Sequence, residues 1–111
     1  MANQHLDTDA LETLKEIMED DFSLLIETFV SDSQNRLKEL QSLLAAGEPD
    51  AVRRCAHSMK GSCGNVGALA LADLLMQLET LGQSGSLDGA SDILSAAEAE
   101  FAQVKQVLQA F

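Results

Sequence analysis

The chain has 111 residues, of which 46% are hydrophobic, and its formal net charge at pH 7 is −11. This length is enough for one core, and we expect residues 1–111 to form a single domain. The acidic balance argues against nucleic acid and anionic membrane surfaces as partners, because both require a basic face. No apolar run reaches the roughly 18 residues that span a bilayer, and the N-terminus lacks the pattern of a signal peptide. A cytoplasmic protein is therefore expected.

Composition and periodicity predict helices throughout. Leu and Ala are abundant, one proline is present, and apolar residues recur every three or four positions in five segments. Asp7 and Asp9 are placed to begin a first short helix, whereas His5 before them is expected in a frayed terminus. A long second helix is expected to follow Asp20 and to end at Gly47, because glycine readily adopts the left-handed conformation that ends helices.

Three more helices are expected in the second half of the chain. Pro49 suits the first turn of a third helix. A largely apolar fourth helix is expected over 68–81, followed by a flexible glycine- and serine-containing connection over 82–89. The last helix, with Asp88 or Ser91 as its cap, keeps its apolar spacing to the end of the chain. The simplest packing is an all-α fold, an antiparallel four-helix bundle with a short additional N-terminal helix.

The third helix has two faces of different character. At about 100° per residue, its apolar residues share one direction: Val52, Cys55, Ala56, Met59, Cys63 and Val66. His57 points about 140° away from this stripe, toward solvent or a partner. Cys55 and Cys63 are too far apart along the helix to bridge each other, so we expect both to pack in the core of a protein from a reducing compartment.

The side that carries His57 also carries Arg53, Lys60, Gly61 and Gly64. A glycine inside a helix costs about 0.5–1 kcal/mol relative to alanine. The two glycines therefore predict a face cleared for a partner's approach to the ring; the alternative is that they admit a neighbouring helix. Cations beside an imidazole favour its neutral, nucleophilic form and would stabilise a phosphoryl group attached to it. For each basic residue taken alone, a solvated helix face is the alternative.

Other chemistries fit these residues poorly. A metal site requires several converging ligands, and His57 has no second ligand three or four positions later. Ser58 adjoins the histidine in sequence but points elsewhere on the helix, so no serine-hydrolase site forms. Gly61, Gly64 and Gly67 follow no strand and lack the spacing of a phosphate-binding loop. Without a nucleotide site the chain is not expected to phosphorylate itself from ATP, so a phosphoryl group on His57 would have to come from another protein.

The run His57-Ser58-Met59-Lys60-Gly61-Ser62, preceded by Ala56 and followed by Gly67-Ala68, resembles the active-site helix of histidine-containing phosphotransfer (HPt) domains. The order of the helices, with this histidine on the second long one, is similar to that family across nearly the whole chain. Because no room is left for a kinase, receiver or membrane segment, the chain resembles the stand-alone bacterial members.

The resemblance implies a phosphocarrier of a multistep two-component phosphorelay rather than an enzyme. His57 would accept a phosphoryl group on Nε2 from the receiver-domain aspartate of a hybrid sensor kinase and pass it to the receiver of a response regulator. Lys60 matches the family lysine that neutralises the phosphoryl oxygens, and Gly61 matches the glycine that admits the partner. Arg53 and Gly64 are added from helical geometry alone, as a second phosphoryl-stabilising cation and a second access position.

No cofactor is expected on this chain, and the resemblance implies that Mg²⁺ belongs to the receiver partner. A complete bundle needs no second copy to close its core, so a monomer is expected. Two alternatives remain open: an adaptor that binds a partner through this face without covalent chemistry, and a kinase-binding inhibitor that has lost the transfer role. The adaptor would explain the glycines and the charges but not the need for an imidazole.

Overall fold

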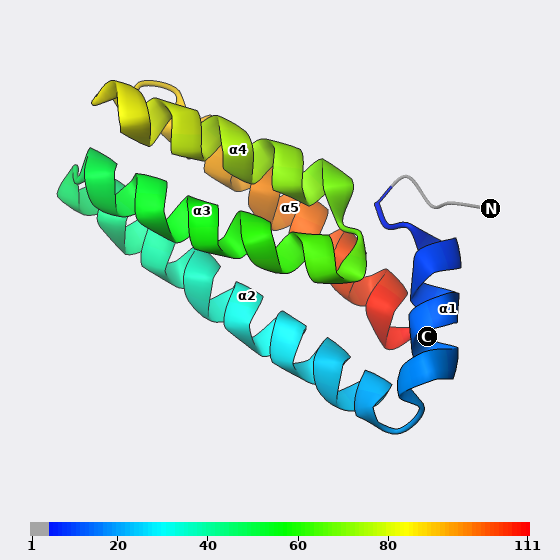
Figure 1. Cartoon of the computed structure of the whole chain (residues 1–111). Helices are drawn as coiled ribbons and strands as arrows, with labels where there is room; N and C mark the ends of the chain where they lie inside the picture. The colour runs from blue at the N-terminus through cyan, green and yellow to red at the C-terminus, as the bar shows by residue number, and fades with distance from the viewer. Residues whose placement is uncertain (1–4) are drawn as a thin grey trace.

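The structure, a computed structural model, describes residues 5–111. It consists of the helices α1 (Thr8–Met18), α2 (Asp21–Ala46), α3 (Pro49–Val66), α4 (Leu69–Ser84) and α5 (Ala90–Gln109), and the described residues form no strand. Helices α2 to α5 lie side by side and alternate in direction, while α1 crosses the end of the bundle where α2 begins and α5 ends (Figure 1). The predicted four-helix bundle with an additional N-terminal helix is confirmed.

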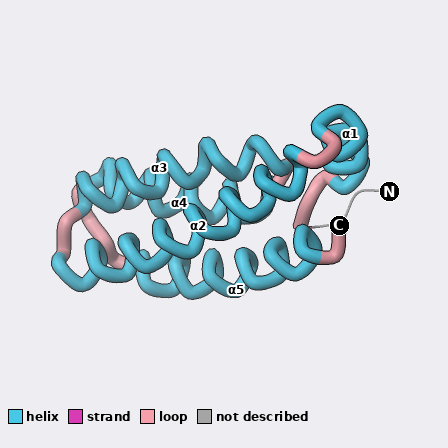
Figure 2. The backbone as a smooth tube through the Cα atoms, turned by 90° about the horizontal axis from the view of Figure 1, so that it is seen from below, coloured by secondary structure: helices cyan, strands magenta, loops and turns pink. Residues whose placement is uncertain are grey.

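The bundle is elongated, with principal-axis extents of 43 × 24 × 19 Å. Its loops gather at the two ends, so that the long faces are made by helices (Figure 2). Gly47 ends α2 with a φ of 67°, and Gly67 ends α3 with a φ of 71°. Both angles lie in the left-handed region that disfavours a Cβ, which explains why glycine stands where the chain reverses.

The fourth helix is longer than predicted. It continues to Ser84, so Gly82 is a buried residue inside α4, and its assignment to the flexible connection is wrong. The last helix begins after Gly89, which occupies the N-cap position expected of Asp88 or Ser91. The error at Gly82 has a physical reason: glycine is a poor helix former, and the sequence of one helix does not show what packs against it.

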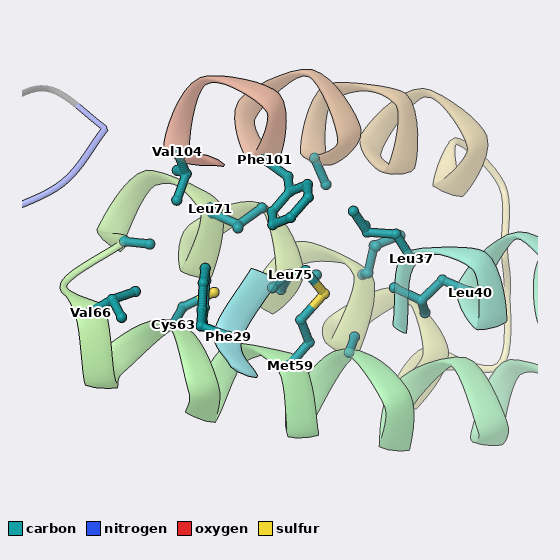
Figure 3. Close-up of a cluster of buried hydrophobic side chains, with 14 of the residues drawn as sticks. Phe29, Leu37, Leu40, Met59, Cys63, Val66, Leu71, Leu75, Phe101 and Val104 are labelled. Atoms are coloured by element: carbon teal, nitrogen blue, oxygen red, sulfur yellow. The ribbon is translucent and has the colours of Figure 1, made fainter. Parts of the chain in front are cut away.

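One side of each helix packs into a continuous apolar core (Figure 3). The predicted stripe of α3 is part of it, and each of its six residues is at most 4% exposed. Leu71 and Leu75 of α4, with Phe29 of α2 and Phe101 of α5, fill the space opposite (Figure 3). Burial of this stripe fixes the rotation of α3 about its axis, and therefore turns the opposite side of the helix outward.

Two thiols and one hydroxyl lie among these apolar side chains. Cys55 and Cys63 are free and buried, as predicted. Burial raises the pKa of Cys55 to about 11 and that of Cys63 to about 12. Ser33 is 1% exposed, and its hydroxyl has no hydrogen-bond partner within residues 5–111. The hydroxyl is therefore a cost to stability that the surrounding core does not offset.

Residues 5–7 tie the start of the chain to the bundle. Leu6 is 2% exposed, and the backbone N–H of Asp7 donates to the carbonyl of Gly67 at 3.1 Å. Nδ1 of His5 lies 2.7 Å from Oε2 of Glu100 on α5. The expectation that His5 is frayed is therefore wrong, because its ring has a specific partner on another helix. These contacts place the start of α1 against the C-terminal end of α3.

Candidate functional site

His57 lies in the middle of α3, and 66% of its side chain is exposed. The predicted outward orientation of this residue is confirmed. Its helix lies between α2 and α4 (Figure 1). The side chain of the histidine is thus accessible while its backbone is packed between two neighbouring helices.

A carboxylate from the next helix holds both His57 and Lys60. Oε2 of Glu79 lies 2.7 Å from Nδ1 of His57, and Oε1 lies 2.6 Å from Nζ of Lys60. The side chain of Glu79 is 19% exposed, whereas that of His57 is 66% exposed, so water reaches the cluster mainly from the side of the ring. We refer to these three residues, His57, Lys60 and Glu79, as the His57 cluster.

Glu79 is ionised at neutral pH. The hydrogen bond from Lys60 is the main cause that holds the pKa of Glu79 below its ordinary value of 4.5; the hydrogen bond from His57 acts in the same direction, and burial opposes both. Because an ionised carboxylate can only accept hydrogen bonds, Nδ1 of His57 carries the proton in this pair. In the neutral ring, Nε2 then keeps an unprotonated lone pair.

Gly61 and Gly64 leave open space on the same face of α3. A Cβ built at either position would have nothing within 4 Å beyond the surrounding helix backbone. Neither glycine admits a neighbouring helix, so that alternative is wrong for both. The access role assigned to them stays a prediction, but the space that it requires is present.

Arg53 is paired with Asp50 rather than with the His57 cluster. Its Nε and Nη2 atoms donate to Oδ1 of Asp50 at 3.1 and 2.9 Å, and Nε of Arg54 lies 3.5 Å from Oδ2 of the same carboxylate. The hydrogen bond from Arg53 is the main cause of a lowered pKa at Asp50. Of the two cations predicted to stabilise a phosphoryl group, the structure brings only Lys60 to the cluster.

Two exposed apolar side chains precede Glu79 on α4. Met76 and Leu69 are 54% and 68% exposed, about one and three helical turns before Glu79. A hollow of about 380 Å³ lies between α1, the end of α3 and the start of α4, and its lining includes Leu14, Gly64 and Leu69. Exposed apolar side chains on the helix next to an exposed histidine suit a protein partner better than a small charged ligand.

The described part of the chain contains neither a metal-binding cluster nor a membrane-spanning helix. No three His, Cys, Asp or Glu side chains there are arranged to hold a metal ion. Every helix within residues 5–111 is too short or too polar to cross a bilayer.

Glu79 is the site residue that the sequence reasoning missed. The pattern of α3 gives no information about it, because it comes from another helix. A usable signal does exist in the register of the two helices: His57 lies ten residues before Gly67, and Glu79 lies ten residues after Leu69. Antiparallel helices joined at this turn bring the two side chains to the same level. Glu79 and Asp73 are also the only charged residues of α4.

Comparison with known proteins agrees with this geometry. The Hpt domain family model matches residues 24–109. The crystal structure of histidine-containing phosphotransfer protein B (HptB) from Pseudomonas aeruginosa PAO1 has a TM-score of 0.91 and 40% sequence identity, and the match covers 96% of this chain and 92% of that one. Histidine-containing phosphotransfer protein ZmHP2 from maize shares the fold, with a TM-score of 0.86 and 24% identity over 96% of this chain and 88% of that one. No curated protein sequence matches the chain.

The family match begins within α2 and extends through α3, α4 and α5, and it includes the exposed histidine and its glutamate partner. The chain belongs to the Hpt domain family.

Proposed function

We propose that this protein is a phosphocarrier in a multistep two-component phosphorelay. His57 accepts a phosphoryl group from the aspartyl phosphate of one receiver domain and passes it to the aspartate of another. The observation that carries the proposal is the state of the ring: His57 is 66% exposed while its Nδ1 lies 2.7 Å from Glu79. This arrangement leaves Nε2 as the nucleophile, and membership of the Hpt domain family supports the same chemistry.

In transfer to this chain, the Nε2 lone pair attacks phosphorus and an N–P bond forms. The bond between phosphorus and the aspartyl oxygen breaks, and its electron pair stays on the receiver's carboxylate. No proton has to leave Nε2. The ring becomes positively charged, and the ionised Glu79 stabilises that charge through Nδ1–H. In transfer to the next receiver the steps are reversed: the N–P bond breaks, and a bond forms between phosphorus and the aspartyl oxygen of that receiver.

Lys60 stabilises the phosphoryl group in this proposal. Its Nζ carries three N–H donors, and the contact with Glu79 uses one of them. The others are free to reach phosphoryl oxygens one helical turn from His57. Arg53 is a second, weaker candidate because it must first leave Asp50; an exposed ion pair of this kind contributes little, so the exchange costs little.

The receiver docks on the face that carries Gly61 and Gly64, beside the exposed side chains of Met76 and Leu69. The receiver's acidic pocket, with its aspartate and Mg²⁺, meets the basic residues of α3, and that partner supplies most of the catalytic apparatus. The chain itself contributes a positioned nucleophile without a nucleotide site. We further propose that the protein acts as a monomer in the cytoplasm, between the receiver of a hybrid sensor kinase and that of a response regulator.

The experiment is incubation of the protein with a receiver domain carrying a radiolabelled aspartyl phosphate. We expect an acid-labile, alkali-stable label that maps to His57 by mass spectrometry. The His57→Gln variant should lose the label, and the His5→Gln variant, which removes the only other histidine, should keep it. A label that persists in His57→Gln refutes the assignment. A protein that binds the receiver yet stays unlabelled is an adaptor or a kinase-binding inhibitor.

A further inference from the structure

Helices α3 and α4 pack tightly against each other at a glycine of α4. Gly82 is buried inside α4, and a Cβ built on it would lie 2.5 Å from the carbonyl oxygen of Pro49. The same Cβ would lie 2.8 Å from the backbone nitrogen of Arg53 and 2.9 Å from its Cβ. Two of these atoms belong to the backbone of α3 and the third is attached directly to it, so none can rotate away. Any side chain at position 82 therefore requires the two helices to separate.

The other two glycines in helix interiors differ from Gly82. Gly61 and Gly64 face open space, and a methyl group on either would fit without movement. Gly82 is thus the helical glycine at which the absence of a side chain sets the distance between α3 and α4. Its position inside α4, against the helix propensity of its residue type, is explained by this contact.

This contact lies next to the His57 cluster. Gly82 follows Glu79 by three residues on α4, and Arg53 precedes His57 by four residues on α3, so each pair is separated by about one helical turn. Glu79 must reach two groups on α3 at once, with one oxygen 2.7 Å from His57 and the other 2.6 Å from Lys60. Because both partners stand on α3, a separation of the two helices lengthens both distances at once.

We propose that Gly82 is a positioning residue for His57: by allowing α3 and α4 to approach closely, it lets Glu79 hold the ring and Lys60 together, and so keeps the proton of the ring on Nδ1. The effect on phosphotransfer rests on the proposed function, whereas the effect on the ring does not.

The expected size of the disturbance follows from the distances. Ordinary van der Waals contact begins at 3.4 Å, so a methyl group at position 82 would require the helices to move apart by about 1 Å at this point. A hydrogen bond of 2.7 Å lengthened by that amount is no longer a hydrogen bond. Both partners of Glu79 then move away from it together, because both stand on α3. The ring of His57 loses its fixed acceptor at Nδ1, and the two neutral tautomers become mixed.

The test is the tautomer of His57 in the full chain, measured by long-range ¹H–¹⁵N correlation in protein labelled with ¹⁵N-histidine. In the unmodified protein we expect the Nδ1–H form of His57. The Gly82→Ala variant should shift the His57 nitrogen signals toward those of a mixture, as should Glu79→Gln. The matched controls Gly61→Ala and Gly64→Ala add the same methyl group on the same bundle and should leave the signals in place.

The second histidine provides an internal reference. Nδ1 of His5 also lies 2.7 Å from a glutamate, Glu100, but this pair joins the start of the chain to α5. Its signals, assigned with the His5→Gln variant, should not change in Gly82→Ala. A folded Gly82→Ala protein that retains the Nδ1–H form of His57 overturns the proposal. So does a shift of equal size in the Gly61→Ala or Gly64→Ala control.

A second variant keeps the test decisive if Gly82→Ala does not fold. Glu79→Asp leaves the helix contact intact and withdraws the carboxylate by about 1.5 Å, the length of one C–C bond. If reach limits the interaction, this variant should give the same tautomer mixture. Retention of the Nδ1–H form in Glu79→Asp would show that the spacing is not critical and would overturn the proposal.

The effect of Gly82 on phosphotransfer is measured in a separate experiment. In single-turnover transfer from a phosphorylated receiver, Gly82→Ala and Glu79→Asp should each lower the rate about tenfold at saturating receiver, with little change in the receiver concentration needed for half the maximal rate. A change confined to that concentration would place Gly82 in docking and overturn its positioning role. If the unmodified protein takes no label, the phosphocarrier proposal fails, while the tautomer measurement still decides the role of Gly82.

Discussion

Ionisation of one carboxylate holds the His57 cluster together. The hydrogen bond from Lys60 is the largest cause of the lowered pKa of Glu79, followed in the same direction by the hydrogen bond from His57. A carboxyl group whose pKa is lower in the folded than in the unfolded chain stabilises the fold above the unfolded pKa. That contribution is lost as the pH falls through the folded pKa. The stabilisation that Glu79 contributes therefore begins to be lost near pH 4.5, and the loss is completed at lower pH.

We predict that Glu79→Gln lowers the free energy of unfolding by about 0.5–1 kcal/mol at neutral pH, a modest value because the cluster is partly exposed. The difference between the variant and the unmodified protein should stay constant above pH 4.5 and shrink at lower pH. Urea unfolding of both proteins across this range measures it. A difference that grows as the pH falls would contradict the assigned direction of the pKa shift.

The residues of the site that could be predicted from sequence share one helix. His57, Lys60 and Gly61 stand within one turn, so their relative placement follows from helical geometry. Glu79 could not be placed in this way, because its contact depends on the register and separation of α3 and α4. The pairing of Arg53 with Asp50 was missed for another reason: at an exposed helix N-terminus several rotamers are open, and spacing does not choose among them.

At the scale of the helix, the glycines of this chain do different things. Gly61 and Gly64 have open space around them, and both have helical backbone conformations. Gly67 has a φ of 71°, and a Cβ built on it would lie 3.0 Å from Cβ of Asp7 in the segment that ties α1 to α3. One substitution, glycine to alanine, should therefore have opposite effects at these positions.

We predict that Gly61→Ala and Gly64→Ala each raise the free energy of unfolding by about 0.5–1 kcal/mol, because alanine is the better helix former and meets no obstruction. The same variants should weaken receiver docking if this face admits the partner. Gly67→Ala should instead destabilise the protein by about 1 kcal/mol or more, since its φ disfavours a Cβ. Urea unfolding and titration with a receiver measure the two effects; unchanged docking in Gly61→Ala would contradict the access role.

Some helix ends could be predicted from the sequence, and others could not. The ends of α2 and α3 were predictable because a glycine follows an apolar periodic segment at each. The end of α4 was placed three residues too early because Gly82 has the composition of a loop. Its helical state depends on the neighbouring backbone of Pro49 and Arg53, which no periodicity within α4 can reveal.

For the molecule as a whole, stability depends on a core that contains one polar exception. Ser33 stands in the apolar stripe of α2 between Phe29 and Leu37, and its buried hydroxyl has no partner among the described residues. We predict that Ser33→Ala raises the free energy of unfolding by about 1 kcal/mol, because it removes an unsatisfied hydroxyl and improves helix propensity. Ser31→Ala, at an exposed position of the same helix, is the control and should have less effect. Destabilisation by Ser33→Ala would indicate that the hydroxyl has a partner in solution.

Charge is also a property of the whole molecule. The net charge is −11, yet Arg53, Arg54 and Lys60 stand close together on the α3 face that carries His57. We predict micromolar receiver binding that weakens with rising salt, because the attraction is local and screened. Arg54→Ala should reduce this salt dependence, whereas Lys105→Ala on α5 should not. Titration calorimetry at low and high salt measures both; an affinity that does not respond to salt would contradict the electrostatic part of docking.

The buried thiols have a practical consequence. With pKa values of about 11 and 12, Cys55 and Cys63 stay protonated at neutral pH, and the core shields them from reagents. We therefore expect the folded chain not to react with maleimide dyes, so neither native cysteine has to be removed before labelling. A single Met76→Cys substitution would place a fluorophore at an exposed position of α4, about one helical turn from Glu79, where its emission would report each arrival and departure of a receiver in real time.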